Sequence, residues 1–123
     1  MEIDEAPLGG FIVLRPVGRL DNAASGEFQE RLLQTATAGV ADVIVDFAAV
    51  EYISSGGLRA LVLAARQKPT ARRLAVVGLH ALVQEIYAIA HFEQVIPIFA
   101  TVEEVARAWS EPGSGDTIGG TRR

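Results

Sequence analysis

The sequence predicts an α/β domain: a small, mixed, largely parallel sheet of four to five strands with about four helices. Short β-branched apolar runs alternate with longer segments whose apolar residues recur at helical spacing. Glycine and proline separate many of these segments. Repeated strand–helix units favour parallel strands joined by right-handed crossovers, with helices covering the sheet. We therefore expect a single domain over residues 1–110.

Four apolar runs are predicted to be strands, at residues 11–17, 42–47, 73–77 and 95–99. A weaker pairing segment lies near residues 2–6. Pro16 cannot donate a hydrogen bond to a neighbouring strand, so we expect its N–H side to face an edge or a bulge. The run at 42–47 is short and rich in valine and isoleucine, which is typical of a buried central strand.

Four helices are predicted between these strands, at residues 22–38, 57–67, 81–90 and 101–109. Apolar residues at i, i+3, i+4 and i+7 give each helix one face to bury. Gly39 follows the first helix and is its expected C-terminal stop. Thr101 and Glu104 have the spacing of a capping box at the start of the last helix.

Composition excludes several classes of function. The 123 residues carry a net charge of −4 and no basic cluster, so nothing indicates direct nucleic-acid binding. The sequence has no cysteine and no apolar run of about 20 residues, which argues against a thiolate site and a membrane span. The acidic N-terminus lacks a signal-peptide pattern, so we expect a cytoplasmic protein. Residues 111–123 are rich in glycine and polar residues, which predicts a disordered tail.

The segment between Phe47 and Leu58 is the candidate functional loop. Sites in parallel sheets lie where strands end and helices begin, and this loop carries Ser54, Ser55, Gly56 and Gly57. The glycines are expected to allow a tight turn that leaves the hydroxyl groups accessible. A simpler interpretation is that a serine caps the next helix and the glycines form the turn. The phosphate-binding pattern GxxxxGK[ST] is absent, which disfavours nucleotide binding.

The same segment carries a family resemblance. A buried strand ending at Asp46, a short Ala-Ala-Val turn and the sequence YISSGGLR at residues 52–59 resemble the signature of the STAS family, the sulfate transporter and anti-sigma factor antagonist domains. The sequence GRLD at residues 18–21 resembles the family's Gly-x-Leu-Asp signature. The resemblance covers roughly residues 3–109, and the predicted elements follow in the same order.

The resemblance implies a phosphorylation switch at Ser55. An unmodified antagonist of this family binds an anti-sigma factor serine kinase and thereby frees the sigma factor. Phosphorylation by that kinase inactivates the antagonist, and a metal-dependent, PP2C-type serine phosphatase restores it. Many members have aspartate where this chain has Ser54, so Ser54 is an alternative phosphate acceptor.

Neighbouring residues are candidates for partner binding. Asp21 and Asp46 both end predicted strands near the same edge of the sheet, where they either cap the following segments or shape kinase and phosphatase docking. The resemblance assigns Ser54, Gly56, Gly57 and Leu58 to the partner-binding segment as well. Arg59 is either a solvated surface charge or a contact to the partner or the phosphate.

Two other functions remain as alternatives, and neither needs a cofactor. One is a non-phosphorylated STAS docking subunit of a stress-sensing or transporter assembly. The other is a serine hydrolase that uses Ser54 or Ser55, although the Gly-x-Ser-x-Gly pattern is missing. His80 and His91 have no ligand spacing typical of a metal site. We therefore expect no metal site, no catalytic residues and no enzyme activity.

Overall fold

Strand pairing in the computed structural model follows the order β1–β2–β3–β5–β6, and β4 pairs with β2 beside β3. The structure describes residues 1–89, 91 and 95–110. Its elements are β1 (Glu2–Leu8), β2 (Phe11–Leu20), α1 (Asn22–Ala38), β3 (Asp42–Asp46), β4 (Val50–Ile53), α2 (Ser55–Gln67), β5 (Leu74–Val77), α3 (Ala81–Ile89), β6 (Ile98–Phe99) and α4 (Val102–Ser110). The predicted tail at 111–123 lies outside the described residues.

The sheet is mixed because its first two strands form a hairpin. β1 pairs antiparallel with β2 along its whole length, from Glu2–Val17 to Leu8–Phe11. Gly9 takes a φ of +62° in the two-residue turn, a conformation that glycine adopts without strain. The other pairings are parallel. The predicted fold class, a mixed and largely parallel sheet with four helices, is therefore confirmed, although the described residues form six strands rather than the predicted four to five.

The long strand β2 pairs in parallel with two different strands, one along each half of its length. Its first half, Phe11 to Leu14, pairs with β3, and its last three residues pair with β4. Pro16 falls in neither parallel pairing, and a register shift follows between Gly18 and Arg19. This placement agrees with the expectation that Pro16 lies next to an edge or a bulge, because the missing N–H is not needed there.

Three predicted boundaries are corrected by the structure. The segment between Phe47 and Leu58 was expected to be a loop, but it contains β4, whose pairing partner is the second half of β2. Helix α2 begins at Ser55 rather than Gly57. The last strand is shorter than residues 95–99, since only Ile98 and Phe99 pair with β5. By contrast, α1 has the predicted bounds and ends at Gly39 with a φ of +69°.

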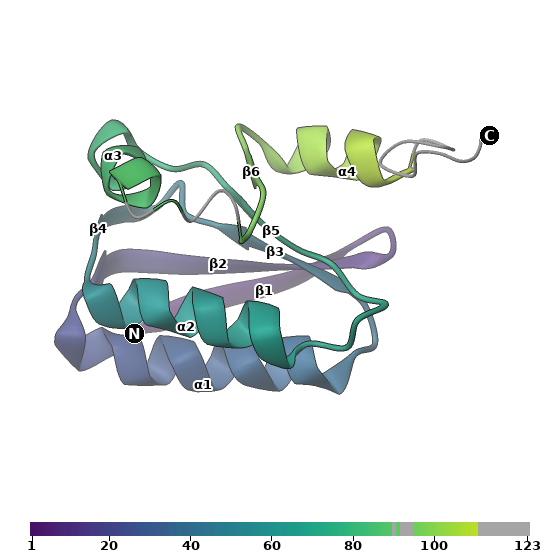
Figure 1. Cartoon of the computed structure of the whole chain (residues 1–123), viewed down its shortest axis with the longest axis horizontal. Coiled ribbons are helices and arrows are strands. Elements are labelled where there is room, and N and C mark those ends of the chain that lie inside the picture. Colours follow the sequence, from purple (N-terminus) through teal and green to yellow (C-terminus); the bar gives the residue numbers. More distant parts are fainter. Residues whose placement is uncertain (90, 92–94, 111–123) are drawn as a thin grey trace.

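Helices cover both faces of the sheet (Figure 1). Helices α1 and α2 lie side by side on one face, where they bury the larger core. Helix α4 packs on the other face against a second core, made of Val13, Ile44, Ala75, Val77, Val102 and Val105. Alternate residues of the central strands β2, β3 and β5 face opposite cores, as the two-residue period of a strand requires. The two faces of the sheet therefore have separate cores, so each surface feature can be assigned to one face or the other.

Candidate functional site

Ser54 is the residue that joins β4 to α2. Its backbone N–H donates to the carbonyl of Leu20 at 2.8 Å, which ties the end of β4 to the end of β2. Its Oγ accepts a hydrogen bond from the N–H of Gly57 at 3.4 Å, and the residue is only 5% exposed. Ser54 is therefore the N-cap of α2, with the extended backbone typical of that position.

Ser55 is the first residue of α2 and is exposed to solvent. The first turn of a helix has backbone N–H groups without partners inside the helix, and it is the positive end of the helix dipole. Anions are stabilised at this position. The structure therefore brings together an accessible hydroxyl and an environment suited to negative charge.

The two glycines provide space rather than a turn, which corrects the sequence-based expectation. Both lie inside α2 and neither has a positive φ. A Cβ on Gly56 would come within 2.7 Å of the Oγ of Ser25 in α1. A Cβ on Gly57 would come within 2.7 Å of the Ile53 Cγ1 and 2.9 Å of a Leu20 methyl group. The glycines thus allow the first turn of α2 to pack closely against α1 and the sheet.

Asp21 caps α1 in the same way that Ser54 caps α2. Its Oδ1 accepts a hydrogen bond from the N–H of Ala24 at 3.0 Å. Because Asp21 follows Leu20, whose carbonyl binds Ser54, the two caps lie next to each other. The starts of α1 and α2 are therefore neighbours, and the cap interpretation of Asp21 is confirmed.

Leu58 and Arg59 point in different directions. Leu58 is 8% exposed and belongs to the larger core, so it anchors the first turn of α2. Arg59 is exposed and lies four residues after Ser55, a spacing that places both side chains on one side of a helix. Of these two residues, Arg59 is the one that a partner or a phosphate at Ser55 can reach.

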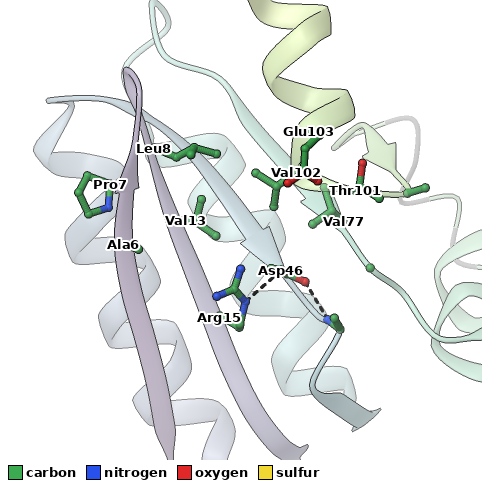
Figure 2. A pocket seen from close by; sticks show the side chains of 13 residues that line it. Ala6, Pro7, Leu8, Val13, Arg15, Asp46, Val77, Thr101, Val102 and Glu103 are labelled. Carbon is green, nitrogen blue, oxygen red and sulfur yellow. Dashed lines mark hydrogen bonds and ion pairs between the residues drawn. The ribbon is translucent and has the colours of Figure 1, made fainter.

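Asp46 lies away from the Ser55 segment, contrary to the prediction that it shares an edge with Asp21. Its Oδ2 pairs with the Nε of Arg15 at 3.0 Å, and its Oδ1 accepts from the N–H of Ala48 at 2.9 Å (Figure 2). Arg15 precedes Leu20 by five residues of β2, a distance of about 17 Å along a strand. The prediction was wrong because β3 pairs with the first half of β2, whereas β4 pairs with the second.

Asp46 instead lines a groove of ≈ 350 Å³ on the face of the sheet that carries α4. Figure 2 shows Arg15 and Asp46 on the floor of this groove, with Leu8 on one side and Val102 on the other. The carboxylate of Asp46 fixes the turn that leads from β3 into β4. The Asp46–Arg15 pair thus supports the site from a distance and does not contact Ser55.

The two histidines flank helix α3. The Nε2 of His80 lies 2.7 Å from the carbonyl oxygen of Ala48, in the turn after β3. His91 follows α3 with a φ of 59°. Among the residues that the structure describes, no group of three histidine, cysteine or acidic side chains could hold a metal ion. Within that same part of the chain, no helix has the length and apolar character to span a membrane.

Ser25 is a neighbour of Gly56 that no sequence pattern predicted. It lies 31 positions before Gly56, and its Oγ donates to the carbonyl of Asn22 at 3.0 Å inside the first turn of α1. No local pattern connects the two positions, because the contact depends on how α1 and α2 pack. The adjacent glycines Gly56 and Gly57 are the sequence feature that marks this close contact, but two adjacent glycines are equally compatible with a turn.

Comparisons with known proteins agree with this architecture. The family model of the STAS domain matches residues 3–105. The chain is 26% identical over 110 residues to BtrV of Bordetella bronchiseptica, a proposed anti-sigma factor antagonist, and the match covers 89% of this chain and 95% of BtrV.

Solved structures have the same fold. An anti-sigma factor antagonist from Mycobacterium paratuberculosis superimposes with a TM-score of 0.84 at 15% identity, over 89% of this chain and 94% of that protein. Unphosphorylated SpoIIAA, an anti-sigma factor antagonist, gives a TM-score of 0.69 at 16% identity, over 89% and 100% of the two chains. Phosphorylated SpoIIAA of Bacillus gives 0.66 at 15% identity, over 86% and 98%. With its fold, its Ser55 segment and a family match over most of its length, the chain belongs to the STAS domain family.

Proposed function

We propose that this chain is an anti-sigma factor antagonist that binds an anti-sigma factor serine kinase and is switched off when that kinase phosphorylates Ser55. The observation that carries the proposal is the exposed Ser55 at the first position of α2. The names of BtrV and of the M. paratuberculosis protein, and the two forms of SpoIIAA, support the same function. With such a partner, the proposed site of action is the cytoplasm.

Ser55 is a better acceptor than Ser54 for a steric reason. A kinase must bring the γ-phosphate of ATP into line with the attacking hydroxyl oxygen. Ser54 is 5% exposed and its Oγ is engaged as the helix cap. Ser55 is exposed at the first position of α2, and its hydroxyl group is not the helix cap. We therefore assign the modification to Ser55 and the structural role to Ser54.

A phosphate at Ser55 changes the surface more than the fold. It adds about −1.5 to −2 charges at neutral pH, and the start of a helix stabilises negative charge. The partner, however, meets a bulky dianion where it had met a neutral hydroxyl. Binding then weakens through repulsion and the cost of removing water from the charge. A PP2C-type serine phosphatase would restore the unmodified surface.

The proposed docking surface is the start of α2 together with the start of α1. Asp21, Ser55 and Arg59 offer polar groups to a partner, and Gly56 lets the start of α2 pack closely beside Ser25 of α1. Ser54, Gly57 and Leu58 are buried and hold this surface in shape. Asp46 is not part of the proposed surface, because it contacts Arg15 and Ala48 elsewhere.

The test is phosphorylation by the cognate kinase. The chain, Ser55→Ala and Ser110→Ala are each incubated with ATP and the kinase, and intact mass is followed with time. Ser110 is also exposed but lies at the end of α4, so it is the matched control. We expect one phosphoryl group on the wild type and on Ser110→Ala, and none on Ser55→Ala. Phosphorylation of Ser55→Ala at the wild-type rate would show that the acceptor is elsewhere.

The same preparation separates the alternative functions. A docking subunit outside a phosphorylation pathway would bind its partner but gain no phosphate. A hydrolase would turn over simple ester substrates and lose that activity in Ser55→Ala. Either result would replace the antagonist proposal.

A further inference from the structure

The exposed side of α2 carries a basic stripe that begins at Ser55. Residues 55, 59, 62 and 66 point within about 60° of one another, because each residue of a helix advances by 100°. Ser55, Arg59 and Arg66 are exposed and Val62 is partly buried between the arginines. We call these four residues the α2 stripe. It is positively charged although the chain as a whole has a net charge of −4.

No ion pair among the described residues neutralises the α2 stripe, and Asp21 at the neighbouring start of α1 is held as a helix cap. Helix α2 contains no acidic residue, and the hydrogen bonds and ion pairs of the described residues leave Arg59 and Arg66 unpaired. The acids of α1 lie on its other side: Glu27 pairs with the N-terminal ammonium group, and Glu30 lines a shallow groove with Met1 and Ile3. Two unpaired arginines around an apolar residue are complementary to an acidic protein surface.

Arg59 also lies within reach of a phosphate on Ser55. Side chains at i and i+4 are neighbours on a helix, and their Cβ atoms are roughly 5–6 Å apart. The side chain of a helical residue leans toward the N-terminus, which directs Arg59 toward Ser55. A guanidinium group forms strong, often bidentate hydrogen bonds with a phosphate. Arg66 lies eleven residues from Ser55, about 16 Å along the helix, and is too distant for the same contact.

We infer that Arg59 binds an acidic surface of the kinase while Ser55 is unmodified and binds the phosphate once Ser55 is phosphorylated, with Arg66 as a second anchor for the kinase. This inference rests on the proposed function and adds the chemistry of the partner and the way the switch acts. Phosphorylation then removes an anchor as well as adding a repulsive charge. Arg59 then contacts the phosphate of its own chain and is no longer available to the kinase.

The phosphate contact can be tested without any kinase. Full-length chain carrying genetically encoded phosphoserine at position 55 is titrated by ³¹P NMR, alongside the same protein with Arg59→Gln or Arg66→Gln. The second ionisation of phosphoserine has a pKa near 6. We expect Arg59→Gln to raise this pKa by roughly 0.15–0.4 pH unit, the effect of losing an exposed helical ion pair. Arg66→Gln should leave it unchanged. Equal values for the wild type and Arg59→Gln would overturn the phosphate contact.

The kinase contact needs affinity measurements on unphosphorylated protein. Arg59→Gln and Arg66→Gln are compared with Arg107→Gln, which neutralises an exposed arginine on α4. We expect each α2 variant to weaken kinase binding about tenfold at low salt and less at high salt, where exposed charges are screened. Arg107→Gln should bind as the wild type does. Wild-type affinity in both α2 variants would refute the acidic partner surface. Failure of the wild type to bind the kinase would refute the proposed function, and the ³¹P result would stand separately.

Discussion

Two adjacent serines have opposite environments at the start of α2. Ser54 is buried and its hydroxyl oxygen accepts a hydrogen bond from the N–H of Gly57, whereas Ser55 is exposed. The division is useful for a switch, because one serine stabilises the helix and leaves the other accessible. If the capping serine were itself the phosphate acceptor, its modification would disrupt the helix cap.

Substitution by alanine should separate the two roles. Ser54→Ala removes the cap and is expected to lower the free energy of unfolding by about 1 kcal/mol. Ser55→Ala removes only an exposed hydroxyl and should change that free energy by less than about 0.5 kcal/mol. Urea denaturation followed by circular dichroism measures both. A larger loss for Ser55→Ala than for Ser54→Ala would contradict the assignment of Ser54 as the cap.

Gly57 and Gly26 offer a second matched comparison. Gly57→Ala places a methyl group against Ile53 and Leu20 and should cost about 1–3 kcal/mol of stability, as overpacking of a core does. Gly26 is exposed in α1, and a Cβ there meets nothing within 4 Å, so Gly26→Ala should stabilise by about 0.5–1 kcal/mol. Thermal denaturation reports both changes. Equal effects from the two substitutions would mean that backbone propensity, rather than packing, determines the role of Gly57.

Helix α4 is attached to the sheet independently of the Ser55 segment. Thr101 Oγ1 accepts from the N–H of Glu104 at 3.1 Å, as the predicted capping box requires, but Glu104 accepts from the N–H of Ala100 at 2.9 Å rather than from that of Thr101. At the other end, Trp109 packs edge-on against Phe11 with ring centroids 5.4 Å apart. These contacts and the second core hold α4 on the face opposite α1 and α2.

Weakening α4 should therefore affect stability without affecting the kinase. Val105 is fully buried in the second core, and Val105→Ala is expected to lower the free energy of unfolding by about 2 kcal/mol. Hydrogen exchange should show the largest loss of protection in α4. Kinase affinity, measured where the variant remains folded, should equal that of the wild type. Reduced affinity would extend the docking surface to the α4 face.

Helices and central strands were predictable because their signals are local. The periodic apolar residues and Gly39 locate α1, and the valine- and isoleucine-rich runs locate β3 and β5. By contrast, the four residues of β4 form a strand through parallel pairing with the second half of β2, a contact that no local pattern indicates. The same long β2 separates Asp46 from Asp21. Whether a double glycine forms a turn or a close contact also depends on packing, since Ser25 is distant in sequence.

For the whole molecule, the sheet separates the proposed switch from the remaining surface features. The Ser55 segment lies at the shared end of β2 and β4, beside α1 and α2. The groove containing Asp46 and Arg15 lies on the face of α4. A charge introduced at Ser55 therefore meets solvent and helix ends, and it breaks no contact of either core. This arrangement allows a modification to change binding while the fold is retained.

A carboxylate at position 55 tests that separation in the whole protein. Ser55→Asp should be as stable as the wild type or up to about 1 kcal/mol more stable, because the start of a helix favours negative charge. Its kinase affinity should fall, though by less than with phosphoserine, since aspartate carries less charge and bulk. Ser110→Asp adds the same charge on α4 and should bind normally. The melting temperature and the kinase Kd are measured for the wild type, Ser55→Asp and Ser110→Asp. If Ser55→Asp bound as tightly as Ser110→Asp, charge at this position would not be the switch. If it unfolded more readily than the wild type, residue 55 would be part of the scaffold.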